Sequence, residues 1–373
     1  KNGLNPDAKR IGSGLPFISV MDILSEGVIN YDNIRGKVNA TEKEIECFGV
    51  KDGDLLFQRS SETLEDVGRA NVYMDNRTAI YGGFVIRGRK IGNYDPLFFK
   101  YLLATPLARK RTCRMGAGAQ HFNIGQEGLS KISLSFPSIE EQRKIAEFLS
   151  LIDERIATQN KIIEDLKKLK SAISKYLFAR KDLLETTICL SNIATLKNGY
   201  AFQSGKYNAL GKWKILTITN VPGERYINDE DCNCIINLPN DIQDHQVLKE
   251  GDILISLTGN VGRVSLCKNG NYLLNQRVGL LQLAKNVNQE FLYQILSSQR
   301  FENSMIACGQ GAAQMNIGKG DVENYVLPYS SNGNNILFAA KILHSYDECI
   351  INELRRLTLL TMQKQYLLTQ MFI

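Results

Sequence analysis

The segment Gly118-Ala119-Gln120-His121-Phe122-Asn123-Ile124-Gly125 recurs later in the chain as Gly311-Ala312-Ala313-Gln314-Met315-Asn316-Ile317-Gly318. Two further matches have nearly the same offset: Lys1-Asn2-Gly3 with residues 197–199, and residues 50–56 with 247–254. Several matches in the same order indicate an internal duplication, whereas a single match would be chance. The 373 residues therefore contain two copies of one structural unit.

A long helix is predicted at the end of each copy. Residues 138–141 (Ser-Ile-Glu-Glu) follow a proline and have the pattern of a capping box. From Ile145 to Leu177, ten positions step by four and three residues, and eight of them are apolar, which is the spacing of a coiled-coil seam. The same steps recur 194 residues later, from Ala339 to Met371, again with eight apolar positions of ten.

Because neither helix can bury this seam alone, we expect the two helices to pair with each other. A parallel pair would place Lys170 beside Lys364, which are like charges. An antiparallel pair centred near residues 164–165 would instead place Lys170 near Glu353 and Gln159 near Lys364. We therefore predict an antiparallel coiled coil, and a helix of about 41 residues would be about 60 Å long.

The fold class we expect is α+β, with two similar, strand-rich mixed α/β domains separated by the two long helices. Short runs rich in Val, Ile, Leu and Tyr alternate with Gly and Asn turns, which is typical of strands, and one helix is expected at each of 98–113 and 290–307. The expected boundaries are 1–137 for the first domain, 138–180 for the central helix, 181–330 for the second domain and 331–373 for the C-terminal helix. Since residues 181–196 have no counterpart before Lys1, we also expect that the first domain lacks an N-terminal segment of roughly 15–20 residues.

The composition is that of an ordinary globular chain, with 43% apolar and 23% charged residues and a net charge of +6. Eight scattered cysteines are too sparse for a disulfide scaffold, so we expect reduced thiols in a cytoplasmic protein. No stretch is apolar enough to predict a membrane span. Residues 1–137 carry 19 basic and 15 acidic side chains, which permits a polyanionic partner without requiring one.

The sequence has few of the motifs that accompany catalysis. It contains no phosphate-binding loop, no Gly-x-Gly-x-x-Gly after a strand, no Asp/Asn-Pro-Pro-aromatic tetrapeptide and no His pair at zinc-ligand spacing. Acid-rich stretches at 224–231 and 241–244 could hold Mg²⁺, but solvated loops explain them better. These absences favour a binding protein that holds no metal or cofactor of its own.

Duplex DNA suits two globular units on a rigid spacer, since the helical period of DNA makes a spacing readable. Base edges are read by Arg, Lys, Asn and Gln, with hydroxyl groups and cations on the phosphates. Our candidates are the turn-borne polar residues Arg59, Ser60, Arg77, Arg87, Arg89, Lys90, Arg114, Gln120, His121, Thr258, Asn260, Arg263, Gln276, Arg277 and Gln314.

Some of these residues also have structural interpretations, and these stay open. Arg59 and Arg263 are favoured for DNA because each lies in the loop after the Gly-Asp strand of its copy. The basic segment 109–111 could complement the dipole of a helix end, and Asn123 and Asn316 could hold a turn.

The helix entrance Phe136-Pro137-Ser138-Ile139-Glu140-Glu141-Gln142-Arg143-Lys144-Ile145-Ala146 resembles that of the specificity subunit of type I restriction–modification systems. The Gly-Asp-Ile-Leu strand at 251–254 and the terminal segment 368–372 fit the same family, so the resemblance covers the whole chain. It implies two target-recognition domains, each reading one half of a bipartite asymmetric sequence in double-stranded DNA. It also implies that the helices act as a ruler and dock two methyltransferase subunits, with restriction subunits in the full complex. S-adenosylmethionine, ATP and Mg²⁺ would then belong to partner subunits, and this chain would be non-catalytic.

The residues expected in the helix pair or at its partner contacts are Glu141, Gln142, Ile145, Ile152, Ile156, Lys170, Ile350, Glu353, Leu357 and Lys364. The second helix entrance, at 328–335, lacks the Glu-Gln pair of the first, so its docking contact would differ. Three alternatives remain open at this stage: an enzyme with a degenerate nuclease or methyltransferase site, a scaffold that binds protein, and a specificity subunit of a system that combines methylation and cleavage on one polypeptide.

Overall fold

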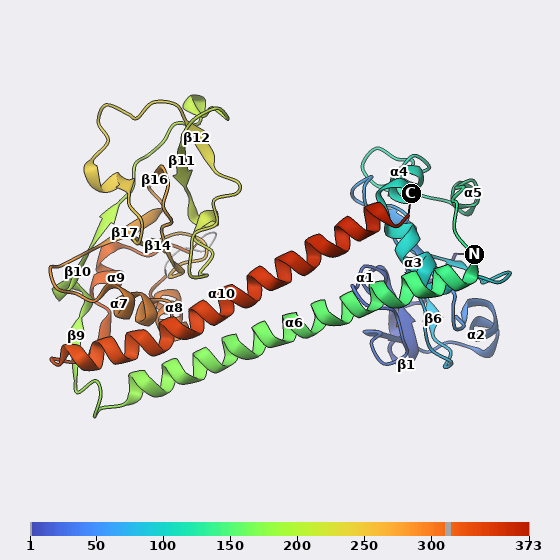
Figure 1. The fold of residues 1–373 in the computed structure, drawn as a ribbon, viewed down its shortest axis with the longest axis horizontal. Coiled ribbons are helices and arrows are strands. Elements are labelled where there is room, and N and C mark those ends of the chain that lie inside the picture. The colour runs from blue at the N-terminus through green and yellow to red at the C-terminus, as the bar shows by residue number, and fades with distance from the viewer. Residues whose placement is uncertain (1, 310–314, 373) are drawn as a thin grey trace. The chain divides into compact units, whose positions relative to one another are not determined.

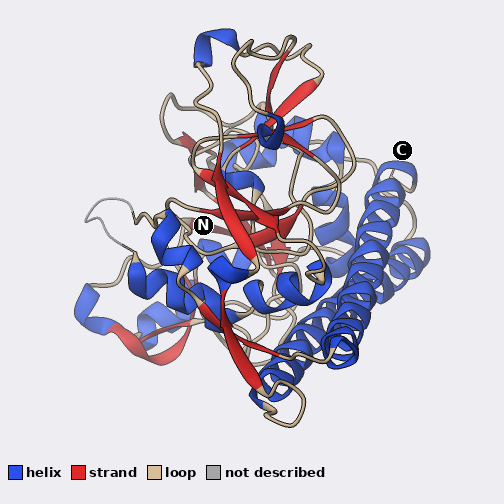
Figure 2. Cartoon of the chain, turned by 90° about the vertical axis from the view of Figure 1, so that its left-hand side faces the viewer, coloured by secondary structure: helices blue, strands red, loops and turns tan. Residues whose placement is uncertain are grey.

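The computed structural model describes residues 2–309 and 315–372. The chain divides into two compact units, Lys1–Lys161 with Arg355–Ile373 (unit 1) and Ile162–Leu354 (unit 2). Each unit contains several β-sheets and a part of each of two long helices, α6 (Ile139–Ala179) and α10 (Gly333–Gln370) (Figures 1 and 2). The expected α+β class is confirmed.

The remaining helices of unit 1 are α1 (Val20–Ile23), α2 (Glu42–Phe48), α3 (Pro96–Ala104), α4 (Pro106–Cys113) and α5 (Gln126–Ser130). Its strands are β1 (Ile11–Ile18), β2 (Gly36–Val38), β3 (Leu55–Gln58), β4 (Ser60–Ser61), β5 (Ala70–Val72), β6 (Ile80–Tyr81), β7 (Val85–Gly88) and β8 (Phe122–Asn123). They form sheets in the orders β2-β1-β6, β5-β3-β7 and β4-β8.

The remaining helices of unit 2 are α7 (Gln289–Leu296), α8 (Gln299–Cys308) and α9 (Lys319–Glu323). Its strands are β9 (Thr186–Cys189), β10 (Ala194–Asn198), β11 (Trp213–Leu216), β12 (Asn233–Ile235), β13 (Val247–Leu248), β14 (Ile253–Ser256), β15 (Val264–Leu266), β16 (Tyr272–Leu274), β17 (Val278–Leu283) and β18 (Val326–Tyr329). Short 3₁₀ helices lie at Ala8–Arg10, Leu190–Asn192, Ser204–Lys206, Ile218–Asn220 and Asp244–Gln246.

Two sheets of unit 2 repeat sheets of unit 1, and a third pairs β18 with β9. The order β12-β11-β16-β13 contains a parallel pair, β11 with β16, that corresponds to β1 with β6. The antiparallel order β10-β17-β14-β15 likewise corresponds to β7-β3-β5, and the pairing of β10 with β17 corresponds to an isolated bridge between Asn2 and Ile86 in unit 1. The duplication in the sequence is therefore a duplication of topology.

The repeated Gly-Asp pair makes the same turn in both copies. Gly53 and Gly251 have φ angles of 79° and 87°, a region that L side chains rarely adopt. The carboxylates of Asp54 and Asp252 accept hydrogen bonds from the backbone N–H groups of Lys51 and Lys249, at 2.9 and 2.8 Å. The motif thus has a structural role, in turning the chain into β3 and β14.

The single helix expected in each copy is two helices. Thr105 caps α4 and Ser298 caps α8, each accepting a hydrogen bond from a backbone N–H at the start of its helix. Pro106 at the first position of α4 cannot continue α3, because proline has no N–H to donate. The break therefore follows from local residues that the periodicity of the apolar positions did not reveal.

Both long helices contribute to the cores. In unit 1, Leu149, Ile152 and Ile156 of α6 pack with Leu368 of α10 and with Tyr101 of α3. In unit 2, Ala339 and Leu343 of α10 belong to the core that contains β14 and α7. In each unit the two helices are antiparallel, as Figure 1 shows.

The register of the helix pair differs from the prediction. Lys170 pairs with Asp347 at 2.5 Å rather than with Glu353, and Lys364 pairs with Asp153 at 2.5 Å rather than with Gln159. Ile350 is buried in unit 2, whereas Leu357 and Ile145 are partly buried in unit 1. Glu353 is partly buried.

No helix among the described residues is long and apolar enough to span a bilayer. The eight cysteines, all within the described ranges, are free thiols.

Candidate nucleic-acid interface

Three segments of unit 2 meet at one edge of the sheet that contains β14 and β17. The N–H of Leu257 donates to the carbonyl of Arg277 at 3.0 Å, and the carbonyl of Leu257 accepts from Ile317 at 3.0 Å. The N–H of Gly259 donates to the carbonyl of Met315 at 2.8 Å. Segments 257–260, 275–277 and 315–317 thus meet at one edge, called here loop edge 2, where Asn260, Gln276 and Arg277 are exposed and Leu257 and Ile317 are buried.

Unit 1 builds the same surface with the same hydrogen bonds. The N–H of Arg59 donates to the carbonyl of Phe84 at 2.8 Å, and the carbonyl of Arg59 accepts from Ile124 at 2.9 Å. Ser60 pairs with Asn123 between β4 and β8. Segments 59–61, 82–84 and 117–124 form loop edge 1, so residues 118–124 of the first copy and the described residues 315–317 of the second belong to equivalent surfaces.

This equivalence corrects the comparison of Arg59 with Arg263. The N–H of Gln58 donates to the carbonyl of Arg69, as that of Ser256 donates to Arg263, so Arg263 corresponds to Arg69. Arg59 corresponds instead to Leu257. Arg69 and Arg263 also have acidic partners, Asp66 at 2.7 Å and Glu302 at 3.4 Å.

Seven of the candidates lie on or next to the two loop edges with side chains at least partly exposed: Arg59, Arg114, Gln120, His121, Asn260, Gln276 and Arg277. Arg114 ends α4 and leads into the 117–124 segment. Within the described part of the chain, the guanidinium groups of Arg59, Arg114 and Arg277 form no hydrogen bond or ion pair. These cations are therefore available to an anionic partner.

Other candidates have their side chains engaged within unit 1. The guanidinium groups of Arg87 and Arg89 both donate to the carbonyl of Gly49, and Arg89 also pairs with Asp54 at 3.1 Å. The ammonium of Lys90 lies 5.2 Å from the ring centroid of Tyr94, a cation–π distance.

Arg77 lies in a cluster of acidic residues. It pairs with Asp32 at 2.7 Å and Asp75 at 2.8 Å, and its guanidinium lies 4.3 Å from the centroid of the Tyr31 ring. Hydrogen bonds from Arg77 lower the pKa of the Asp75 carboxyl and raise the pKa of Arg77. A phosphate would have to displace these carboxylates to reach Arg77.

Ser60 and Thr258 occupy equivalent places beside the repeated Asn. The hydroxyl of Ser60 donates to the side-chain oxygen of Asn123. Thr258, 8% exposed, is paired with Asn316 through an isolated antiparallel β-bridge of the backbone. These contacts fit the structural interpretation of the two asparagines, as residues that hold the turn. Gln314 lies outside the described residues.

The sequence did not draw attention to Phe84. Its side chain is 66% exposed on loop edge 1. The carbonyl of Phe84 accepts from Arg59 as the carbonyl of Arg277 accepts from Leu257 on loop edge 2, so the two residues are equivalent. An aligned comparison of the turns before β7 and β17 could have found it.

The start of α6 is held from inside unit 1. Gln142 is 2% exposed; its amide oxygen accepts from the N–H of Asp95 at 2.9 Å, and its amide N–H₂ donates to the carbonyl of Pro137 at 2.8 Å. Glu141 is exposed; its backbone N–H donates to the hydroxyl of Ser138 at 3.4 Å, and that hydroxyl donates to the Glu141 carboxylate at 3.5 Å, where the predicted capping box has the carboxylate on a backbone N–H. Gln142 therefore connects α6 to the start of α3, whereas Glu141 remains open to a partner.

A buried ionic network in unit 2 was also missed. Arg225, 9% exposed, donates to Glu290 at 2.7 and 2.9 Å, to Asp347 at 3.0 Å, and lies 3.0 Å from the ring nitrogen Nδ1 of His344. Burial alone would raise the pKa of Glu290, but hydrogen bonds from Arg225 and Gln294 lower it below its ordinary value. A lone Arg in an acidic loop gave no signal of this contact.

Among the described residues, no group of three or more His, Cys, Asp or Glu side chains could hold a metal ion. The site is thus described by its two loop edges, with their exposed cations and amides.

Comparisons with known proteins agree on one family. The model of the type I restriction modification DNA specificity domain matches residues 12–168 and 185–362. The MjaVIII type I restriction enzyme specificity subunit of Methanocaldococcus jannaschii is 27% identical over 300 residues, which is 74% of this chain and 67% of that protein. The EcoKI specificity subunit of Escherichia coli is 26% identical over 149 residues, 39% of this chain and 32% of that protein.

Two solved structures share the fold. The type I restriction–modification S subunit from M. genitalium has a TM-score of 0.59 at 17% identity, over 100% of this chain and 93% of that chain. A structure described as the basis of complex assembly and conformational transition of a type I system has a TM-score of 0.57 at 14% identity, over 95% of this chain and 90% of that one. With the family match over both copies, the chain belongs to the type I restriction–modification DNA specificity family and is a specificity subunit, a non-catalytic component of such a complex.

Proposed function

We propose that the chain selects a bipartite, asymmetric sequence in double-stranded DNA, with each recognition domain reading one half through its loop edge. The domains are residues 1–137 and 181–330, and the paired helices, 138–180 and 331–373, fix the number of unread base pairs between the halves. The single observation that carries the proposal is the presence of two equivalent loop edges with different side chains.

The chemistry of the loop edges supports this proposal. Loop edge 2 offers Asn260, Gln276 and Arg277, residue types that pair with base edges in the major groove. Loop edge 1 offers Arg59, Gln120 and His121, with Arg114 nearby as a contact for phosphate. Because the backbone framework is shared and the side chains differ, the two edges would read different sequences, which makes the target asymmetric.

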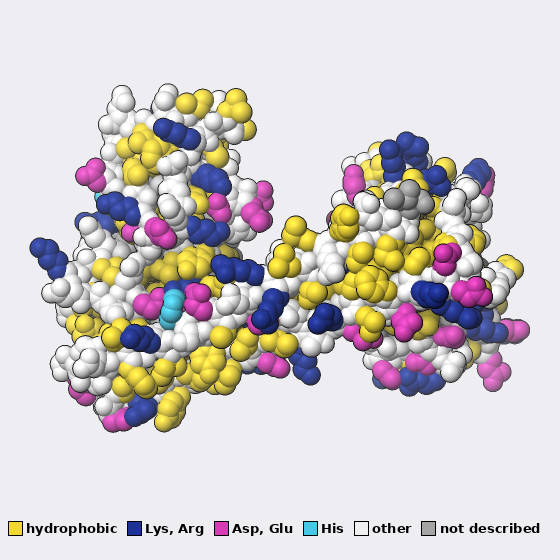
Figure 3. Space-filling model, in the orientation of Figure 1, with side chains coloured by type: hydrophobic (Ala, Val, Ile, Leu, Met, Phe, Trp, Pro, Cys, Tyr) yellow, Lys and Arg dark blue, Asp and Glu magenta, His cyan; other side chains and the backbone are white. Residues whose placement is uncertain are grey.

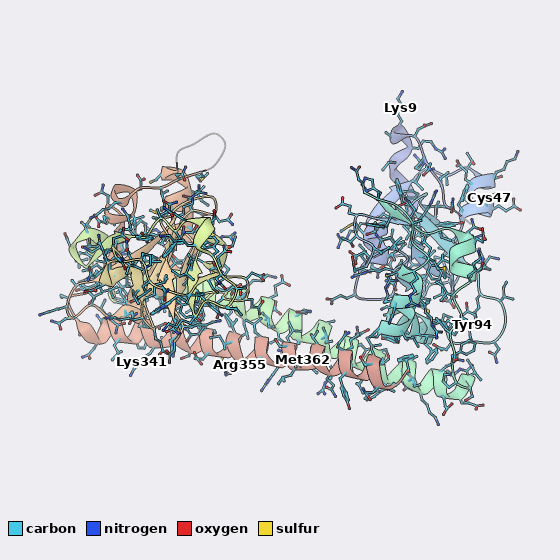
Figure 4. All side chains as sticks on the ribbon, turned by 90° about the horizontal axis from the view of Figure 1, so that it is seen from above. Lys9, Cys47, Tyr94, Lys341, Arg355 and Met362 are labelled. Atoms are coloured by element: carbon cyan, nitrogen blue, oxygen red, sulfur yellow. The ribbon has the colours of Figure 1, made fainter. Side chains whose placement is uncertain are left out.

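The helices would also dock two methyltransferase subunits. On α6, Phe148, Ile162, Leu169 and Tyr176 follow one another at seven or fourteen residues, and their side chains are 41–63% exposed. On α10, Met362 is 62% exposed (Figure 4). Apolar side chains among charged ones also mark the helix surface in Figure 3. Apolar residues at heptad spacing outside the seam favour contact with further helices.

In this proposal, catalysis belongs to the partners. The methyltransferase subunits would bind S-adenosylmethionine, and restriction subunits in the full complex would use ATP and Mg²⁺ to move and cleave DNA. The complex would act on DNA in the cytoplasm.

The test is a selection from randomised duplex DNA with the chain co-expressed with its methyltransferase partner. We expect two short conserved blocks at a fixed separation. The variant Arg277→Ala should relax the block read by unit 2 and leave the other intact, whereas Arg77→Ala, whose guanidinium is held by carboxylates, should change neither. A single continuous block would contradict two-domain reading, and no enriched sequence would refute the proposal.

A further inference from the structure

A cluster of Asp, Lys and Tyr joins the two long helices to the globular part of unit 1. Asp153 of α6 accepts from the ammonium of Lys364 of α10 at 2.5 Å and from the hydroxyl of Tyr101 of α3 at 2.8 Å. The ammonium lies 6.0 Å from the centroid of the Tyr101 ring. Burial, and then the charge of Asp153, raise the pKa of the Tyr101 hydroxyl, which keeps it a hydrogen-bond donor. We call this cluster clasp 1.

Unit 2 contains a corresponding cluster with the helices exchanged, in which the aspartate accepts from Gln294 where Asp153 accepts from a tyrosine hydroxyl. Asp347 of α10 accepts from the ammonium of Lys170 of α6 at 2.5 Å, and that ammonium lies 6.0 Å from the ring centroid of Tyr293 of α7. Asp347 also accepts from Gln294 of α7 at 2.6 Å and from Arg225 at 3.0 Å. We call this cluster clasp 2.

The two clasps are related by the internal duplication. Asp153 and Asp347 are 194 residues apart, and so are Lys170 and Lys364. On each helix the Asp and the Lys are separated by 17 residues. Both clasps therefore specify one and the same antiparallel register, although each lies wholly within its own unit.

The apolar seam alone does not specify this register. A seam of alternating four- and three-residue steps repeats every seven residues, so sliding one helix by about a heptad again places apolar residues opposite apolar ones. The register in which Lys170 faces Glu353 and Gln159 faces Lys364 satisfies the seam in this way. It would, however, separate each lysine from its aspartate. Lys170 would exchange Asp347 for Glu353, whereas Lys364, Asp153 and Asp347 would each lose their ion-pair partner in the helix pair.

Separating the pairs is unfavourable because the charges are not freely hydrated. The side chains of Asp347 and Lys170 are 8% and 18% exposed, and those of Asp153 and Lys364 are 22% and 25% exposed. A partly buried charge that loses its partner keeps its desolvation penalty. Polar residues within a coiled-coil seam are known to select register for this reason.

We propose that the two Asp–Lys–Tyr clasps select the register of the helix pair and fix each recognition domain at one height on it, so that Asp153, Lys170, Asp347 and Lys364 are positioning residues for the spacing of the DNA target. The link to DNA spacing rests on the proposed function, whereas the choice of register does not.

The register can be measured without DNA by pulsed electron paramagnetic resonance on the full chain. Labels at Glu147 and Thr361, both exposed and both in unit 1, would be attached through introduced handles other than cysteine, since the chain has eight free thiols. We expect one distance in the parent chain. In Lys170→Gln with Lys364→Gln, a second, longer distance should appear, because a slip of one heptad moves the helices by about 10 Å.

Two variants make the result decisive. Adding Asp153→Lys and Lys364→Asp to the Lys170→Gln chain restores an ion pair in clasp 1 with its charges exchanged, and should restore the single parent distance. Lys168→Gln with Lys175→Gln removes two lysines outside the clasps and should leave the distance unchanged. A folded Lys170→Gln/Lys364→Gln chain with only the parent distance would overturn the inference. If the Lys170→Gln/Lys364→Gln chain does not fold, the variant with exchanged charges in clasp 1 decides the question. Its folding with the parent distance supports the inference, and its failure to fold overturns the inference.

The DNA selection then separates this inference from the proposed function. Two distances together with several gap lengths would support both. Two distances with an unchanged gap would support register selection but contradict its role in spacing, and no DNA selectivity in the parent chain would refute the proposed function alone.

Discussion

The most quantitative prediction compares the two aspartates of the clasps. Asp347→Ala leaves two cations without this carboxylate, Arg225 and Lys170, whose side chains are 8% and 18% exposed. Removing one partner from a buried ion pair costs about 3–5 kcal/mol, and because Arg225 keeps its two hydrogen bonds to Glu290 we expect the lower end of that range, about 3 kcal/mol. Asp153→Ala leaves one cation, Lys364, 25% exposed, and one neutral hydroxyl, so its cost should be about 1–2 kcal/mol.

The assay is urea denaturation followed by two signals. Trp213, the only tryptophan of the chain, lies in β11 of unit 2, so its fluorescence reports on that unit, whereas circular dichroism reports on both. Asp347→Ala should shift the fluorescence midpoint to clearly lower urea, and Asp153→Ala should shift it little. Equal shifts, or a larger fluorescence shift for Asp153→Ala, would refute the argument from burial and charge.

Three further predictions concern other parts of the molecule. Glu290 has a lowered pKa in the folded state, so its stabilising contribution is present above the ordinary pKa of a glutamate and is lost as the pH falls through the folded value. Glu290→Gln should therefore make the melting temperature fall less steeply as the pH is lowered. The same steepness in the variant and the parent chain would contradict this role. Gly251→Ala should destabilise the chain by about 1–2 kcal/mol, because φ is +87° there and the new methyl group would lie 3.0 Å from Gln289. Gly205→Ala, with open space around the new methyl group, is the control in the same thermal melts. Arg277→Ala should weaken specific DNA binding by about 1–3 kcal/mol, measured by fluorescence anisotropy with the methyltransferase present, and Arg77→Ala should not; the reverse order would count against loop edge 2 as a reading surface.

The architecture was predictable because the sequence repeats the same elements in the same order. The duplication and the two seams predicted both long helices, found at Ile139–Ala179 and Gly333–Gln370, and their antiparallel pairing. The register was not predictable from the seam, because the seam repeats every seven residues. Asp153 and Asp347, which select it, lie one residue outside the seam positions 152 and 346.

The candidate site was predicted in part for a similar reason. The DNA-binding residues stay a prediction: the structure places the first repeated segment and residues 315–317 of the second beside the loops after β3 and β14, but the sequence could not separate the engaged arginines from the exposed ones. Arg87 binds the carbonyl of Gly49, which is 38 residues away, and Arg225 binds Asp347, which is 122 residues away. Such contacts depend on tertiary folding, so no local sequence pattern predicts which arginines form them.

The central claim is that the paired helices fix the separation of the two DNA half-sites. The most direct measurement removes one heptad from the middle of each helix, residues 158–164 and 352–358, keeping both clasps and both seams in phase, and repeats the selection from randomised duplex DNA. Seven residues of helix span about 10 Å, or about three base pairs of DNA. We predict the same two conserved blocks with a gap shorter by about three base pairs. The same blocks with an unchanged gap, from a chain that still folds, would contradict the account.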